Sequence, residues 1–283
     1  LISDRPLRNF FQLALTDTLR NASKAATGWP YIAPAKLHER AREKEALNEF
    51  VEQVTRMISD LQEVQKLNSG KEIKCLLIKG DARVPVPDVQ YRSVSLAITS
   101  PPYLNNYDYA DRTRLETYFF GWYRSWGEIT RAVRTKLITA ATTQVVRGRQ
   151  QAVDELTYKI READPKLYVE LRSKIEQLSE LRLKKGGKKS YDLMVARYFN
   201  DMADVLSAVF LALKNGGDFV LVLGDSAPYG VHIPTEEYLA RIALGLGYSA
   251  WQVERLRARG EKWRTNPQRH KVMLKEVILT LTK

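Results

Sequence analysis

The first 70 residues place apolar side chains at the spacing of amphipathic helices. Asp4 can cap a first helix, and Gly28-Trp29-Pro30 ends that segment. A second helix closes at Asn68-Ser69-Gly70. The apolar faces are formed by Leu7, Phe10, Phe11, Ala14 and Leu15 in the first helix and by Leu47, Phe50, Val51, Val54, Ile58, Leu61 and Leu67 in the second. We expect residues 1–70 to be N-terminal helices that pack on a sheet.

Two short apolar runs follow, from Ile73 to Ile78 and from Val94 to Thr99, and their length predicts strands. Each run leads into a polar loop. The first loop is Gly80-Asp81-Ala82-Arg83 and the second is Ser100-Pro101-Pro102-Tyr103. Open parallel sheets carry functional loops at the carboxyl ends of their strands, so both loops are candidates for chemistry.

Residues 131–197 are expected to be helical and basic, with 16 Lys and Arg against 8 Asp and Glu. Pro165 splits this stretch into two helices. The tract from Arg182 to Lys189 predicts a mobile loop that contacts phosphates. Two interpretations stay open, a solvated helical hairpin and an insertion that faces a nucleic acid. The second helix carries an apolar stripe of Leu167, Leu171, Ile175 and Leu178.

The alternation of helices and strands then resumes. The strand from Asp218 to Leu223 ends in Gly224-Asp225-Ser226, and Thr235 can cap a helix that runs to about Leu244. The last two strands, Tyr248 to about Arg257 and Leu274 to Leu281, predict an antiparallel pair at a sheet edge. The helix before this region has one apolar side, formed by Met194, Tyr198, Met202, Leu206, Val209 and Leu213.

These elements predict an α/β protein in three parts. Residues 71–130 and 198–283 form the core with the sheet, residues 1–70 add helices to it, and residues 131–197 are a helical insertion. A chain of 283 residues with 44% hydrophobic content is sufficient for a packed core. No stretch approaches the length of a transmembrane span.

The charge balance changes the expected class of partner. The 45 Lys and Arg residues against 33 Asp and Glu give a net charge of +12, which favours a polyanion, nucleic acid before a membrane surface. The single cysteine, Cys75, excludes an internal disulfide and fits a reducing, cytoplasmic compartment. Its apolar neighbours predict a buried core thiol. The start at Leu1 has neither an initiator Met nor a signal-peptide pattern, as expected of a chain that begins inside a longer protein or after processing.

The loop Ser100-Pro101-Pro102-Tyr103 has the residue types that methylation of an exocyclic base amine requires. A hydroxyl and a rigid carbonyl accept hydrogen bonds from the NH2 group, and an aromatic ring offers a flat surface to a base that has left the helix. The two prolines fix φ and remove two backbone donors near the methyl acceptor. The same turn also arises as plain loop chemistry, so its surroundings decide between the two interpretations.

With these residues in order, the chain resembles the amino-group DNA methyltransferases, which have a Rossmann-like sheet, S-adenosylmethionine as donor and a Ser/Asp/Asn-Pro-Pro-Tyr/Phe loop. The resemblance covers roughly residues 73–283, interrupted by the insertion. Each supporting match is weak alone, and the ordered set carries the resemblance. The matches are Gly80 to Arg83, Tyr107-Asp108-Tyr109 to Trp122, Leu213 to Gly217, Gly224 to Ser226 and Leu246-Gly247-Tyr248.

One expected motif is absent from this sequence. The family holds its methyl donor with an Asp/Glu-Pro-Phe-x-Gly-x-Gly turn after the first strand, and none of the glycine pairs here follows an early apolar strand. The first two strands of the sheet are therefore expected to be missing. Because a sheet without its central strand exposes an apolar edge, the chain alone should be poorly stable. The resemblance implies a second polypeptide or an N-terminal fragment with the cofactor loop, as in the split members of the family.

The resemblance implies a role for individual residues. Ser100 and the Pro101 carbonyl would hold the amine, with Pro102 keeping the loop rigid, and Tyr103 would stack on the flipped base. Asp81, Thr99 and Ser100 are placed beside S-adenosylmethionine. Base-pocket candidates are Tyr107, Tyr109, Asp225 and Ser226, and candidates for contact with double-stranded DNA are Lys184, Lys185, Arg255, Arg257, Lys262, Arg264 and Arg269. No histidine has metal-ligand spacing, so no metal is expected.

Three alternatives stay open. A serine at the first loop position resembles the cytosine-N4 members more than the adenine-N6 members, which makes cytosine N4 the preferred target. An RNA base methyltransferase has a related loop, usually with Asp or Asn first and with a separate RNA-binding domain. A non-catalytic DNA-binding subunit, with a degenerate cofactor pocket, is the interpretation from another class. The leading expectation is a site-specific DNA methyltransferase subunit of restriction-modification or phage defence.

Overall fold

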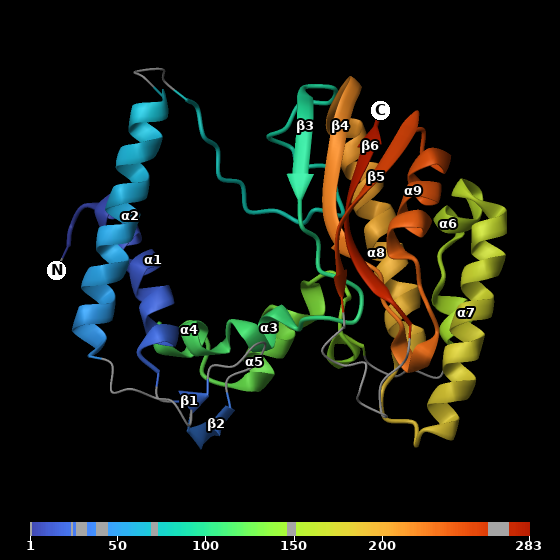
Figure 1. Cartoon of the computed structure of the whole chain (residues 1–283), viewed down its shortest axis with the longest axis horizontal. Coiled ribbons are helices and arrows are strands. Elements are labelled where there is room, and N and C mark those ends of the chain that lie inside the picture. The colour runs from blue at the N-terminus through green and yellow to red at the C-terminus, as the bar shows by residue number, and fades with distance from the viewer. Residues whose placement is uncertain are drawn as a thin grey trace. The chain divides into compact units, whose positions relative to one another are not determined.

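The computed structural model describes residues 2–23, 25–26, 33–37, 45–68, 73–145, 151–259 and 272–283. The contacts divide the chain into two units (Figure 1). The helical unit comprises Leu1–Leu77 and Tyr109–Thr135, and the sheet unit comprises Ile78–Asp108 and Lys136–Lys283. Among the described helices, none combines the length and the apolar character needed to cross a membrane.

The helical unit is built on two long helices, α1 (Arg5–Asn21) and α2 (Ala46–Asn68). The Asp4 carboxylate accepts a hydrogen bond of 2.7 Å from the Leu7 N–H, which confirms the predicted cap. Arg20 and Glu116, 2.6 Å apart, join α1 to a short helix, α4. The other elements of this unit are β1 (Ala25–Ala26), β2 (Ala33–Leu37), α3 (Tyr109–Arg112), α4 (Arg114–Phe119) and α5 (Trp126–Ala132).

The sheet unit contains a four-stranded sheet in the order β3-β4-β6-β5 (Figure 1). Strands β3 (Val94–Thr99) and β4 (Leu213–Gly224) are parallel, whereas β6 (Leu274–Thr282) is antiparallel to both β4 and β5 (Ala250–Arg259). The predicted antiparallel pair at a sheet edge is confirmed. Because β3 and β4 are parallel, the loops that follow their carboxyl ends lie at the same end of the sheet.

Helices cover one face of this sheet in two layers (Figure 1). The long helix α8 (Tyr191–Ala212) and α9 (Thr235–Gly245) lie against the strands, and α6 (Tyr158–Ala163) and α7 (Pro165–Lys184) lie outside them. The predicted stripe of α7 is fully buried in the same core as α8. The inward-facing strand residues are Phe219, Leu221, Leu223, Val277, Leu279 and Leu281. Four single 3-10 turns complete the described elements: Arg134–Lys136, Thr142–Gln144, Ala152–Glu155 and Pro228–Gly230.

The prediction of a strand from Ile73 to Ile78 is wrong for the described structure. These residues form no strand, and Leu77 is almost fully exposed. An apolar run becomes a strand only when a neighbour accepts and donates its backbone hydrogen bonds, and no described strand pairs with this run. Cys75 is exposed as a result, so the prediction of a buried thiol is also wrong.

Two helix ends differ from their expected form. The lysine tract is a defined turn: the Gly187 N–H donates to the Arg182 carbonyl, and Gly186, at φ +77°, donates to Leu183. This pattern is a Schellman cap, which needs a left-handed residue and so favours glycine. Thr235 is the first helical residue of α9, and its hydroxyl donates back to the Ile233 carbonyl. Pro234 takes the capping position predicted for Thr235.

Candidate active site at the strand ends

The loop Ser100-Pro101-Pro102-Tyr103 begins where β3 ends, beside β4. Thr99, the last residue of β3, pairs with Leu221 of β4. The Ser100 hydroxyl donates its hydrogen to the Val222 carbonyl, with the two oxygens 3.2 Å apart. A hydroxyl has one hydrogen and two lone pairs, so this bond leaves Ser100 able to accept. Ser100 is exposed, which leaves its oxygen accessible to a ligand.

Buried residues anchor this loop to the rest of the sheet unit. Pro101 and Leu104 are buried, whereas Pro102 and Tyr103 are half-buried. Beyond them, Asn105 adopts a left-handed φ of 60°, and the Asn106 N–H donates to the Ala140 carbonyl over 3.1 Å. The loop is therefore fixed before any ligand arrives, as positioning of a reacting group requires.

Tyr103 bonds through its hydroxyl to a residue of β6, which lies two strands away from β3 in the sheet. Its hydroxyl donates to Oε1 of Glu276, 2.6 Å away on β6, and Nε of Arg257 on β5 donates to Oε2 of the same carboxylate. Burial raises the pKa of Glu276, but the hydrogen bonds from Arg257 and Tyr103 outweigh it, so this pKa lies below its ordinary value. Burial and the Glu276 carboxylate raise the pKa of Tyr103, which keeps its proton.

The Asp225 side chain is buried at the carboxyl end of β4 and has its own partners. Oδ1 accepts the Lys275 N–H over 2.7 Å, and Oδ2 lies 2.7 Å from Nε2 of His232. Ser226 is buried too, and its backbone pairs with Ile233 in both directions. Asp225 and Ser226, which are both base-pocket candidates, thus lie at the same end of the sheet as the loop that contains Ser100. Their hydrogen bonds stabilise the turn after β4.

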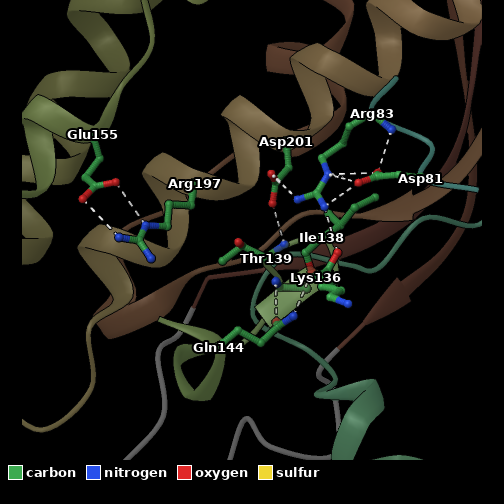
Figure 2. A network of polar contacts seen from close by, with 10 residues as sticks. Asp81, Arg83, Lys136, Ile138, Thr139, Gln144, Glu155, Arg197 and Asp201 are labelled. Atoms are coloured by element: carbon green, nitrogen blue, oxygen red, sulfur yellow. Dashed lines mark hydrogen bonds and ion pairs between the residues drawn. The ribbon is translucent and has the colours of Figure 1, made fainter. Parts of the chain in front are cut away.

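The loop after the expected first strand is fixed by a network around Arg83 (Figure 2). The Arg83 guanidinium donates to both oxygens of Asp81, to Asp201 of α8 over 3.0 Å and to the Lys136 carbonyl over 2.8 Å. Because Arg83 donates to Asp81, the pKa of that carboxyl is lowered. Asp201 also accepts the Thr139 N–H. Asp81 therefore already serves as the partner of Arg83.

A second part of the network surrounds Gln144 (Figure 2). Oε1 of Gln144 accepts the N–H groups of Ala140 and Ala141, each over 2.8 Å, and Nε2 donates to the Ile138 carbonyl. Ala140 is the residue whose carbonyl accepts from Asn106. The segment that Gln144 organises therefore holds the end of the loop that contains Ser100.

The aromatic base-pocket candidates fall in different units. Tyr107 belongs to the sheet unit and is half-buried, next to Asp108, whose buried carboxylate accepts from the Thr143 hydroxyl over 2.8 Å. Tyr109 begins α3 of the helical unit and is exposed, as is Trp122 of the same unit. The surroundings of Tyr107 are therefore those of the sheet unit, and the surroundings of Tyr109 and Trp122 are those of the helical unit.

The basic candidates lie in three places. Lys184 and Lys185 are exposed where α7 ends, and Nζ of Lys185 is 5.7 Å from the ring of Tyr229, in the loop that follows β4. This contact brings the lysine turn beside the loop that begins at Asp225. Arg255 and Arg257 are exposed on β5, although Arg257 also binds Glu276. The remaining candidates, Lys262, Arg264 and Arg269, lie outside the described residues.

The glycines near the sheet do not form a cradle for a nucleotide cofactor. A Cβ at Gly224 would lie 2.1 Å from the Arg259 side chain, one at Gly245 2.0 Å from the Ala163 backbone, and one at Gly247 3.0 Å from Phe210. In the described part of the chain these close approaches accommodate the protein's own atoms. The residues present do not fit a complete site for S-adenosylmethionine, because the Asp81 oxygens are also taken.

Two residues of the site were missed by the sequence interpretation. Glu276 binds the Tyr103 hydroxyl and Asp201 binds Arg83, yet neither stands in a motif. The only signal for Glu276 is a carboxylate at the start of an apolar strand, where a buried charge needs a partner. A charge on the apolar helix α8 is the corresponding signal for Asp201.

The sequence is similar to two curated proteins, both named Type II methyltransferase M.AvaI, one from Nostoc sp. (strain PCC 7120 / SAG 25.82 / UTEX 2576) and one from Anabaena variabilis. Each is 25% identical over 169 residues, which are 59% of this chain and 33% of the relative. The match spans about a third of the length of these relatives. No protein-family model and no solved structure matches the chain. By their names these two relatives are methyltransferases, and the mixed α/β architecture of this chain is compatible with a methyltransferase-like fold.

Proposed function

We propose that this chain carries the catalytic loop of a site-specific DNA methyltransferase. The enzyme would transfer a methyl group from S-adenosylmethionine to the exocyclic amine of a flipped base, cytosine N4 before adenine N6, in restriction-modification or phage defence. The observation that carries the proposal is the rigid loop at the carboxyl ends of β3 and β4, with the Ser100 hydroxyl fixed by Val222. The similarity to Type II methyltransferases supports the same class.

The loop supplies two acceptors to the amine. The Ser100 hydroxyl oxygen accepts one N–H and the Pro101 carbonyl accepts the other, which turns the nitrogen lone pair out of conjugation with the base. Neither Pro101 nor Pro102 has a backbone N–H that would compete for that lone pair. Tyr103 provides the stacking surface. Alignment of the two reactants accounts for most of the rate enhancement.

We infer that a second segment, on a partner chain or preceding this one, supplies the glycine-rich cofactor loop. Two features of the sheet unit support it. On β3, Leu96 is 53% exposed and Ile98 68% exposed, and in the described structure β3 pairs only with β4. An apolar pocket of about 190 Å³ lies near the start of β3, with Val86, Tyr91 and Val209 in its lining. Leu96 and Ile98 point to the face of the sheet opposite the one that α8 and α9 cover, so an element of the second segment that lies on this face would cover them, and an apolar side chain would fill the pocket.

A non-catalytic DNA-binding subunit is the second candidate. The basic, exposed lysine turn beside the loop after β4 favours binding to a phosphate backbone in either case. The two candidates differ in whether Ser100 does chemistry.

A labelled-methyl transfer assay on DNA and on RNA separates them. The chain is tested alone and together with the segment that completes it, as wild type, as Ser100→Ala and as the control Ser93→Ala, whose hydroxyl donates to the Gln90 carbonyl. We expect transfer to DNA only with the second segment, loss in Ser100→Ala and no change in Ser93→Ala. Activity that survives Ser100→Ala would contradict the proposed role of Ser100. Activity of the chain alone would contradict the need for a second segment.

A further inference from the structure

The guanidinium of Arg259, the last residue of β5, lies over the ring of Tyr103. Its central carbon is 5.2 Å from the ring centroid, within the range of a cation–π contact. Tyr103 is half-buried and packs against the core of the sheet unit. The face under Arg259 is thus closed by a side chain that comes from β5, the strand at the opposite edge of the sheet from β3.

Two further observations fix the position of this guanidinium. Nη1 donates to the Asp225 carbonyl over 3.2 Å. The same nitrogen lies over Gly224, where an added Cβ would be only 2.1 Å from it. The guanidinium occupies space that any side chain at Gly224 would take. Position 224 does not need a glycine for its backbone angles, because its φ is not positive.

The distance leaves no room for a base between the two groups. Stacked planar groups need about 3.5 Å each, so a base between Tyr103 and Arg259 would require about 7 Å. The ring cannot easily retreat, because its hydroxyl is bound to Glu276. A base that stacks on this face must take the place of the guanidinium.

We propose that Arg259 is a placeholder for the target base, which keeps the stacking face of Tyr103 covered until a base arrives. This inference rests on the proposed function. When a base arrives, the guanidinium gives up its hydrogen bond to the Asp225 carbonyl and its contact with the Tyr103 ring, and water solvates it instead. The base then stacks on the ring. Since a cation–π contact between partly exposed groups is weak, the cost of the exchange is small and lowers base capture by about two- to fivefold.

Steady-state methylation tests the proposal, with the enzyme assembled from this chain and its second segment and with long double-stranded DNA of mixed sequence as the probe. Gly224→Ala keeps the positive charge but drives the guanidinium off the ring. The nearest atom outside Arg259 is the Lys275 carbonyl oxygen, 3.2 Å from the new Cβ, which must move by only a few tenths of an ångström. We expect kcat/KM to rise about two- to fivefold. Arg259→Ala, expected to act in the same direction, serves if Gly224→Ala does not fold.

The control is Arg172→Ala, which removes a similar arginine–tyrosine contact, with Tyr168 on α7, and should leave the kinetics unchanged. A second readout is the Arg259 Nε–H resonance in protein labelled at arginine. Ring current from Tyr103 should shift it, and Gly224→Ala should remove that shift. Unchanged or reduced kcat/KM in Gly224→Ala, with the shift removed, overturns the placeholder and leaves the proposed function intact. A wild-type enzyme that transfers no methyl group overturns the proposed function, and the placeholder with it.

Discussion

The hydrogen bond between Tyr103 and Glu276 joins the loop that contains Ser100 to β6, two strands away from β3 in the sheet. A tyrosine ring on a loop can rotate about two bonds, and a fixed hydroxyl removes much of that freedom. Glu276 remains ionised because Arg257 and Tyr103 both donate to it. The carboxylate therefore sets the orientation of the ring without touching a base itself.

Removing either partner of this bond should slow base methylation. A hydrogen bond to a charged group contributes about 1.5–3 kcal/mol, so we expect Tyr103→Phe and Glu276→Ala each to lower kcat/KM by at least about tenfold. Glu276→Gln keeps an acceptor and should recover part of the loss. The check is a double-mutant cycle, in which the two single losses should not add. Fully additive losses would mean that Glu276 acts elsewhere.

The low pKa of Glu276 predicts how stability depends on acid. A carboxyl whose folded pKa lies below its unfolded value of about 4.3 stabilises the fold above that pH, and the contribution disappears as pH falls through the folded pKa. Wild type should therefore exceed Glu276→Gln in melting temperature near pH 7, and the gap should shrink below about pH 4. Melting curves of the completed enzyme between pH 3 and 7, roughly spanning these values, measure it. A gap independent of pH contradicts the assignment.

Individual residues differ in how far their role in the site could be predicted from the sequence. Ser100 and Tyr103 stand together in a tetrapeptide, so their chemistry could be predicted from adjacent letters. Glu276 is 173 positions from Tyr103, and only the register of β6 against β4 brings it there. Arg259 is, in the sequence, one of several arginines in a basic region. Its contact with Tyr103 depends on where β5 ends.

Among the elements, α7 shows how the insertion is integrated into the fold. Its stripe packs on α8, and α8 packs on the sheet, so this helix contributes to the same core as β4 and β6. The periodicity of four apolar residues predicted the buried face. It could not predict the surface that would cover that face, since a solvated hairpin has the same pattern.

Truncation of the stripe should destabilise the whole sheet unit. We expect Ile175→Ala, at a fully buried position, to cost about 2–5 kcal/mol in the free energy of unfolding. Val169→Ala, on the exposed side of α7, is the control and should cost within about 0.5 kcal/mol. Denaturant unfolding followed by the fluorescence of Trp251 on β5, in a background where the other four tryptophans are replaced by phenylalanine, reports the sheet. Loss of α7 without a change at Trp251 would show a separate insertion.

The run from Ile73 to Ile78 shows that local composition alone does not decide whether a strand forms. Its composition is that of a strand, but a strand exists only as part of a sheet, and no described strand pairs with it. β3 has a similar apolar composition and forms because β4 pairs with it in register. Local sequence thus predicted both runs equally, and the presence of a neighbour decided between them.

For the whole molecule, the net charge of +12 makes binding to a polyanion depend on salt. Lys184→Gln/Lys185→Gln should weaken DNA binding and lower the slope of log K against log salt by about 0.9 for each phosphate that is no longer neutralised. Lys166→Gln/Lys174→Gln removes the same charge elsewhere on α7 and should shift the slope less. Fluorescence anisotropy across a salt series measures both. Equal slopes for the two variants would make the effect one of net charge alone.

The exposed apolar side of β3 predicts the behaviour of the chain without its second segment. Leu96 and Ile98 should drive self-association of the isolated chain, because they form an exposed apolar patch on the open face of the sheet. A charge on this patch opposes its burial, so Ile98→Lys should keep the isolated chain monodisperse and should abolish assembly with the second segment. Val169→Lys, which adds the same charge on the exposed side of α7, should do neither. Light scattering of each variant, alone and mixed with the segment, gives both results. Assembly that survives Ile98→Lys would place the second segment away from β3.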